Sequence, residues 1–388
     1  MKKTLFSILL FCLGTMISCS EPTDDLTAGK TDPNEKPKPE IPSYIGEISS
    51  TIVPLEFTQN MGVGWNTTNT LDANAGSGLG AETSWGNPKV TEALIDSVAA
   101  RGFKTLRVPV SWGQHIGEAP GYVIDPMWMS RVEQVVKWGL ENDMYVIINI
   151  HHDDDRVVPT KEKIAESKVF VSAIWKQIAI RFKRYNEKLI FETLNEPRVV
   201  GHPLEWQGGD MDGRKHINEL HKTAVNTIRQ TGGNNIYRML MIAPYVASFN
   251  AIDGFELPND KRLIVSLHSY SPYWFCLSDF DVQYEFTDNH INELKGEFDR
   301  YYDKFISKGI PIVIGEWGAK QRDLPDGSGN NHDHCVRHAE VFAKEAKLRG
   351  IIPVVWDFGY IDRYTYKWTR AEEIAKIIDA ADIKMDKK

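Results

Sequence analysis

The amino-acid sequence predicts an α/β fold and, within that class, a single (β/α)₈ (TIM) barrel. Short apolar segments rich in Val and Ile alternate with longer amphipathic segments, which is typical of buried parallel strands connected by helices. Eight such strands favour a closed barrel, because an open sheet of this size normally carries a Gly-rich phosphate turn after its first strand. The chain of 388 residues fits one such domain, since these barrels often fill about 250 residues or more.

The predicted strands and helices alternate along the whole domain. The strands are predicted at 61–66, 105–110, 145–151, 189–195, 239–244, 263–270, 311–317 and 353–359. The helices between them include 90–100, 129–141, 169–185, 217–230, 291–307 and 336–348. Three helices are followed by glycine, a residue that commonly ends helices, in Arg101-Gly102, Gly232-Gly233 and Arg349-Gly350.

Residues 1–19 are predicted to be a processing signal outside the fold. Two lysines precede an apolar run from Leu5 to Ile17 that is too short for a comfortable membrane span. The run ends at Ser18-Cys19 and resembles a lipobox, so Cys19 is the expected lipid anchor, with an ordinary secreted protein as the alternative. The acidic residues that follow resemble an export signal of lipoproteins, which favours the outer membrane and the cell surface, with a periplasm-facing anchor as the other option.

Residues 20–43 are predicted to be a disordered tether. They are rich in Pro, Lys, Asp, Glu and Thr and contain too few apolar side chains to bury a core. From residue 44 to residue 388 the composition does not change again and no repeat is visible, which predicts one catalytic domain. Cys276 and Cys335 remain in this domain, so one disulfide is possible but no disulfide framework is implied.

The charge and composition favour some partners over others. The net charge is −8 and no stretch is dense in Lys and Arg, so nucleic acid is not expected as a partner. The 11 Trp residues of this acidic protein favour aromatic platforms for sugar rings, although most Trp side chains usually pack in the core. No protein partner is implied, and contact with a membrane is expected only through the lipid anchor.

Polar and aromatic residues follow nearly every predicted strand, at the face where (β/α)₈ barrels carry catalysis. They are Trp65, Asn66, Arg107, His151, His152, Asn195, Glu196, Tyr245, His268, Tyr270, Glu316, Trp317 and Trp356. Glu196 and Glu316 follow strongly apolar runs, where a carboxylate is costly unless it is paired or used. They are therefore the candidate catalytic residues.

Two glutamates that meet across a barrel mouth suit the hydrolysis of a glycosidic bond. One protonates the leaving oxygen and the other attacks the anomeric carbon, and a separation of about 5–5.5 Å selects the retaining route. We expect burial and like-charge repulsion to raise the pKa of Glu196, while Arg107 and Tyr270 keep Glu316 ionised. Asn195 is expected to bind the sugar 2-hydroxyl. The alternative is that the two glutamates form separate surface ion pairs.

Six ordered motifs, one per strand, resemble glycoside hydrolase family 5, a retaining family of clan A. They are Arg107-Val108-Pro109-Val110, Asn149-Ile150-His151-His152, Asn195-Glu196-Pro197, His268-Ser269-Tyr270, Gly315-Glu316-Trp317-Gly318 and Trp356. Gly64-Trp65-Asn66, Asn69–Ala73 and Glu82–Pro88 are similar to subfamily 4, which contains endoglucanases and xyloglucanases. The resemblance extends from Phe57 to the last helix, and departs at Thr67-Thr68, where Leu-Gly is common.

The resemblance implies a role for each matching residue. Glu196 would be the acid/base and Glu316 the nucleophile, oriented by Arg107 and Tyr270. His268 would lie near the acid/base, and His151 and Trp356 would line the sugar subsite before the cut. Further substrate contacts would be Asn66, Trp112, His152, Trp206 and Trp317. The implied substrate is a β-linked plant polysaccharide, cleaved internally as a β-1,4-glucan of the cellulose-like, mixed-linkage or xyloglucan type.

Other functions remain as alternatives. A β-mannanase or a xylanase would share the fold, and a surface glycan-binding lipoprotein would have kept binding and lost turnover. A metal-dependent hydrolase is a third class, and segments 151–155 and 332–335 contain several potential ligands. The first strand carries no His-x-His pair, and neither segment offers the spaced ligand set of a catalytic zinc, so no metal and no cofactor are expected. A structural cation at 332–335 stays open.

Overall fold

The computed structural model describes residues 41–386, and the part from Pro42 onward forms one compact unit. The predicted signal segment with Cys19, and the predicted tether up to residue 40, lie outside the described residues. Among the described helices, none combines the length and the apolar character needed to cross a membrane.

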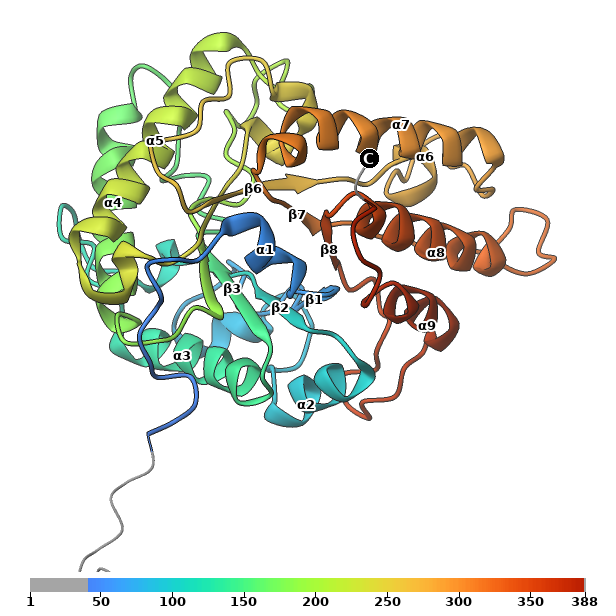
Figure 1. Cartoon of the computed structure of the whole chain (residues 1–388), viewed down its shortest axis with the longest axis horizontal. Coiled ribbons are helices and arrows are strands. Elements are labelled where there is room, and N and C mark those ends of the chain that lie inside the picture. The colour runs from blue at the N-terminus through green and yellow to red at the C-terminus, as the bar shows by residue number, and fades with distance from the viewer. Residues whose placement is uncertain (1–40, 387–388) are drawn as a thin grey trace, which may run out of the picture. The chain divides into compact units, whose positions relative to one another are not determined.

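Eight parallel strands close into a barrel in chain order (Figure 1). They are β1 (Gly64–Asn66), β2 (Thr105–Val108), β3 (Tyr145–Asn149), β4 (Leu189–Glu192), β5 (Leu240–Ile242), β6 (Leu263–His268), β7 (Ile312–Glu316) and β8 (Ile352–Val355). Gly64 pairs with Thr105 on one side and with Val354 on the other, which closes the ring. The predicted barrel and its eight strands are confirmed, although most strands end earlier than predicted, because the polar residues that follow belong to loops.

Helices pack around the barrel, most of them between successive strands, with α1 before β1 and α9 after β8 (Figure 1). They are α1 (Pro54–Gln59), α2 (Glu92–Arg101), α3 (Pro126–Glu141), α4 (Ile164–Arg181), α5 (Met211–Gln230), α6 (Tyr273–Cys276), α7 (Asp288–Lys304), α8 (His332–Leu348) and α9 (Ala371–Asp379). Side-chain caps start several of them, as where Thr91 accepts a hydrogen bond from the backbone of Leu94. Gly102 ends α2 in the left-handed conformation, as its sequence predicts.

The barrel interior changes from apolar to polar along the strands. Ile147, Ile190 and Ile264 belong to one apolar cluster inside the barrel, which Phe57 of α1 joins. Two residues further along the same strands, the inward positions hold Asn149, Glu192 and Ser266, all fully buried. The alternation with a period of two therefore places a layer of polar side chains directly below the C-terminal mouth of the barrel.

Candidate active site

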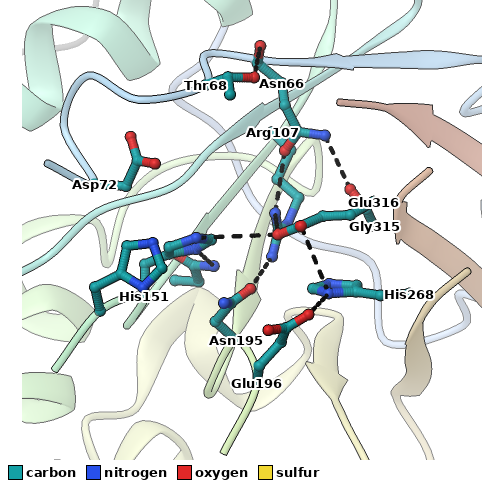
Figure 2. A network of polar contacts seen from close by, with 12 residues as sticks. Asn66, Thr68, Asp72, Arg107, His151, Asn195, Glu196, His268, Gly315 and Glu316 are labelled. Atoms are coloured by element: carbon teal, nitrogen blue, oxygen red, sulfur yellow. Dashed lines mark hydrogen bonds and ion pairs between the residues drawn. The ribbon is translucent and has the colours of Figure 1, made fainter. Parts of the chain in front are cut away.

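Arg107 of β2 is the centre of this polar layer. Its fully buried guanidinium donates to Glu192 Oε2 at 2.8 Å and to Glu316 Oε1 at 2.9 Å. It also donates to Asn66 Oδ1 at 3.1 Å and to Asn195 Oδ1 at 2.7 Å (Figure 2). Burial alone would lower the pKa of Arg107, but the charges of Glu192 and Glu316 outweigh it and raise the pKa further. Arg107 is therefore a permanent cation that holds several functional side chains in fixed directions.

Glu192 is a functional residue that the sequence analysis missed. It is fully buried at the end of β4 and accepts hydrogen bonds from Arg107, from Asn149 Nδ2 at 2.8 Å and from Ser266 Oγ at 2.6 Å. A glutamate inside the apolar run Leu189–Glu192 was the available signal, since a buried carboxylate needs a partner. The partner is Arg107, and the buried ion pair fixes its guanidinium in turn.

The structure brings Glu196 and Glu316 together at the mouth. One carboxylate oxygen of each lies within 4.8 Å of the other, and His268 belongs to the same cluster (Figure 2). Glu316 is buried and accepts hydrogen bonds from Arg107 and from the Tyr270 hydroxyl at 3.0 Å. The two glutamates are thus neighbours in one polar network and not separate surface ion pairs.

His268 changes the expected charge state of Glu196. Its Nδ1 lies 2.7 Å from Glu196 Oε1 and 3.7 Å from Glu316 Oε2. Burial raises the pKa of Glu196, but the hydrogen bond and charge of His268 outweigh it, so the pKa lies below its usual value. Burial lowers the pKa of His268, but the charges of both glutamates raise it above its usual value. The prediction of a raised pKa for Glu196 is therefore wrong, because the hydrogen bond and charge of His268 outweigh the effect of burial.

His151 and Trp356 form one side of the same site. The His151 Nε2 lies 3.9 Å from Glu316 Oε1, and its Nδ1 lies 3.1 Å from Asn149 Nδ2. The His151 and Trp356 rings are nearly parallel, at 8° with centroids 6.0 Å apart. Burial, together with the neighbouring His152, holds the pKa of His151 well below its usual value. His151 is thus a neutral hydrogen-bonding group beside the carboxylate.

Three predicted substrate contacts have side chains that are fully buried and do not face the cleft in this structure. Trp112 donates from Nε1 to the Asn149 carbonyl, and Trp317 stacks on Phe342 of α8 at 4.1 Å. Asn66 donates to the carbonyls of Gly315 and Val355, at 2.9 and 3.1 Å. Trp317 directly follows Glu316, so the period of two turns its ring away from the mouth toward the helices. These three residues pack and hydrogen-bond beneath the site instead of facing the cleft.

Two cavities meet at Trp356 and together form an open cleft. One has a volume of about 1030 Å³ and is lined by both glutamates, Trp206 and Trp274. The other has a volume of about 780 Å³ and is lined by polar residues that include Asn87, Lys320 and Arg363. Trp206 is 63% exposed, and the half-buried His152 contacts Trp85 with ring centroids 5.3 Å apart. The cleft therefore extends from the glutamate pair in two directions and has exposed aromatic rings along it.

The described residues contain two groupings that could hold a metal ion. One is Glu196, His268 and Glu316, and the other is Asp72, His151 and His152. Asp72 already accepts hydrogen bonds from the backbone of Asn69 and Thr70, at 3.1 and 2.6 Å. The potential ligands of segment 332–335 do not point to one shared site. His332 contacts Glu372, whereas His334 accepts a hydrogen bond from the backbone of Phe286.

The two cysteines of the domain are free and buried. Burial raises the pKa of the Cys276 thiol well above its usual value. Cys276 is therefore a packed thiol and not an activated nucleophile. The possible disulfide between Cys276 and Cys335 is not formed in this structure.

A barrel that carries two convergent glutamates in an aromatic cleft defines a glycoside hydrolase, and comparison with known proteins identifies the family. Residues 68–362 match the cellulase domain of glycosyl hydrolase family 5. The chain is 46% identical over 316 residues to endoglucanase B of Clostridium cellulovorans, which covers 80% of this chain and 69% of that protein. The chain belongs to glycosyl hydrolase family 5.

Solved structures agree with this assignment. A broad-specificity endoglucanase of subfamily 4 from Clostridium acetobutylicum has a TM-score of 0.79 and 40% identity, over 84% of this chain and 99% of that one. A xyloglucan-specific endo-β-1,4-glucanase of family 5 from a metagenomic library, in complex with cellotriose, has a TM-score of 0.80 and 34% identity. That match covers 84% of this chain and 99% of the other. The resemblance to subfamily 4 is therefore confirmed.

Proposed function

We propose that this protein is an endo-acting β-1,4-glucanase that hydrolyses glucan chains with retention of configuration. The proposal depends on one observation, the oxygen-to-oxygen distance of at most 4.8 Å between Glu196 and Glu316. Retaining enzymes place their carboxyl groups about 5–5.5 Å apart, whereas inverting enzymes need about 6.5–9.5 Å to admit a water molecule. The short distance favours direct attack by a carboxylate.

In the first step, Glu316 attacks the anomeric carbon and the bond to the leaving oxygen breaks. Arg107 and Tyr270 donate to the two oxygens of Glu316 and hold the carboxylate in one direction. The leaving oxygen takes its proton from the Glu196–His268 pair, whose hydrogen bond of 2.7 Å allows the proton to pass from the imidazole through the carboxylate. The product of this step is a glycosyl ester on Glu316.

In the second step, water hydrolyses that ester. Glu196 removes a proton from the water, the water oxygen bonds to the anomeric carbon, and Glu316 leaves as a carboxylate. Asn195 accepts from Arg107 through Oδ1, so its amide nitrogen is the end that can donate to the sugar 2-hydroxyl. The same residues thus serve both half-reactions.

The shape of the cleft supports internal cleavage of a chain. Because Glu196 protonates the leaving group, the arm of the cleft beside Glu196 and Trp206 would bind the departing part of the glucan. The other arm, beyond Trp356, would bind the part that is attached to Glu316. The relatives are named endoglucanases, and one solved neighbour is named xyloglucan-specific. Cellulose-like, mixed-linkage and xyloglucan chains are the proposed substrates.

The test is the release of reducing sugar from soluble cellulose derivatives, mixed-linkage β-glucan, xyloglucan, mannan and xylan, with viscosity measured in parallel. We expect a rapid fall in viscosity with at least one β-1,4-glucan, because internal cuts shorten the chain before much sugar is released. Activity confined to mannan or to xylan would contradict the glucanase proposal and indicate the corresponding enzyme of the same fold. A wild-type protein that is inert on every substrate would indicate a glycan-binding protein.

A further inference from the structure

Arg198 connects the acid/base to the aromatic arm of the cleft. It lies two residues after Glu196, and its Nη1 donates to the Glu196 carbonyl at 3.1 Å. Its two terminal nitrogens bind the two oxygens of Asp154, each at 3.1 Å, and its Nε binds Glu205 Oε1 at 3.0 Å. Asp154 lies in the loop after β3, whereas Glu196 and Glu205 both lie in the loop between β4 and α5. One guanidinium therefore joins these two loops at the mouth of the barrel.

The same guanidinium lies over Trp206, with its central carbon 4.7 Å from the ring centroid. Trp206 directly follows Glu205, whose second carboxylate oxygen accepts from the backbone of Gly201 at 2.7 Å. The Arg198 side chain is only 12% exposed, whereas Trp206 is 63% exposed and lines the cavity that contains Glu196. An exposed tryptophan in a loop would otherwise have several open rotamers, and the cation on its ring selects one of them.

We propose that Arg198 is a positioning residue that fixes Trp206 as a stacking platform for the sugar on the leaving-group side of the cleaved bond. This inference rests on the proposed function, because it takes Glu196 as the group that protonates the leaving oxygen. The contact to the Glu196 carbonyl and the contact to Trp206 share one rigid fork, so the platform and the proton donor keep a constant spacing. A leaving sugar that stacks on Trp206 then presents its oxygen to Glu196 in the same place each time.

Two kinds of substrate distinguish a role in positioning Trp206 from a general effect of Arg198 on the catalytic site. An aryl β-cellobioside with a nitrophenyl leaving group puts no sugar on the Trp206 side and leaves with little help from an acid. Mixed-linkage β-glucan puts sugars on both sides of the cut. We expect Arg198→Ala, Arg198→Lys and Glu205→Gln to lower kcat/KM on β-glucan by between about tenfold and a hundredfold. On the aryl cellobioside the same variants should change kcat/KM by less than about twofold, because the glycone arm and Glu316 are untouched.

A double-mutant cycle adds a second readout. Trp206→Ala should show the same split between the two substrates as Arg198→Ala. In the Trp206→Ala background, Arg198→Ala should lower β-glucan hydrolysis by less than about threefold more, because the platform that it positions is already gone. Independent effects that multiply would contradict the proposal.

Arg349→Ala is the matched control. Arg349 also binds two carboxylates, Asp299 and Glu345, and is 11% exposed, but it lines a separate small cavity away from the glutamates. We expect it to lower the melting temperature and to leave both activities unchanged. If the milder variants Arg198→Lys and Glu205→Gln lost kcat/KM equally on both substrates, the positioning role would be contradicted, while the proposed function would stand. A wild-type enzyme that hydrolyses neither substrate would contradict the proposed function, and this inference with it.

Discussion

At the scale of single residues, the site depends on one buried cation and the acids that surround it. Arg107 contacts Glu192, Glu316, Asn195 and Asn66, so four side chains from the ends of β1, β4 and β7 and the loop after β4 share one guanidinium. A fork with five donors suits this task, whereas a lysine offers only a point charge. Glu192 neutralises the charge of Arg107 on the side away from the mouth, while Glu316, on the other side, faces the substrate.

Glu192→Gln tests this support. The variant keeps the shape of the side chain but removes its charge, so the fully buried Arg107 loses one of its two acidic partners. Breaking a buried pair costs about 3–5 kcal/mol, and we expect a fall in unfolding free energy of that order. We also expect kcat to fall more than tenfold (~1.4 kcal/mol in the barrier), because Arg107 reorients Glu316 and Asn195. Chemical denaturation and steady-state kinetics are the measurements.

Glu373→Gln provides the comparison for this variant. Glu373 is 1% exposed and pairs with Arg370, as Glu192 pairs with Arg107, but it lies on α9. We expect a similar loss of stability with a much smaller loss of kcat. Equal loss of kcat in the two variants would show that Glu192 acts only through general stability.

The pair formed by His268 and Glu196 predicts a pH dependence of stability. The pKa of Glu196 is lowered from 4.5, so its stabilising contribution is present above that value and is lost as the pH falls through the folded pKa. The pKa of His268 is raised from 6.5, so its contribution is present below that value and is lost as the pH rises through the folded pKa. The difference in melting temperature between wild type and His268→Gln should therefore be largest between pH 4.5 and 6.5. A difference that is constant from pH 3 to pH 9 would contradict the shared proton.

At the scale of elements, the sequence predicts where strands lie better than where side chains point. Buried runs such as Ile312–Gly315 identify a strand, and the glutamate that ends it is visible as an exception. The family resemblance implies that Trp112 and Trp317 contact substrate, but a ring near a strand end can turn either into the mouth or toward the helices. The pKa of Glu196 could not be predicted either, since it depends on the distance to His268 on another strand.

The loop between β4 and α5 gives a prediction at this scale. Gly209 has a φ of +63°, and an added Cβ would lie 2.3 Å from Cε2 of Tyr245. Tyr245 accepts a hydrogen bond from the backbone of Val199, so it cannot move away freely. We expect Gly209→Ala to destabilise the protein by about 2–4 kcal/mol through overpacking and backbone strain, measured by denaturation.

Gly201→Ala, in the same loop, separates the cost of overpacking from the cost of backbone strain. Gly201 also has a positive φ, of +80°, but its added Cβ would meet no atom within 4 Å. We expect it to cost only about 1 kcal/mol from the backbone conformation. If the two variants were equally unstable, the contact with Tyr245 would not be what shapes the loop.

At the scale of the whole molecule, the barrel places the chemistry at one end of a closed sheet. The eight-stranded topology was predictable because each strand is a separate apolar run and each helix separates two of them. Glu316 ends β7 and Glu196 lies in the loop shortly after β4, so closure of the barrel brings the two glutamates together across 120 residues of sequence. The substrate range is set by loops whose shapes the sequence pattern does not give.

We propose that the catalytic domain is anchored to the outer membrane by a lipid on Cys19, most simply on the outer side, where polysaccharide is present. The support is the apolar run that ends at Ser18-Cys19 and the polar segment that follows it. In cell fractionation, wild type should partition with membranes and Cys19→Ala should be recovered in soluble form with its activity intact. Membrane partitioning of Cys19→Ala equal to that of wild type would contradict the anchor.

The central claim is that Glu316 attacks the sugar directly while Glu196 and His268 supply the proton. Proton NMR of a cello-oligosaccharide digest, recorded within the first minutes before the anomers equilibrate, observes the outcome directly. We predict that the newly formed reducing end appears first as the β-anomer and that the α-anomer grows only by later mutarotation. Initial appearance of the α-anomer would show inversion through a water molecule and would contradict the account.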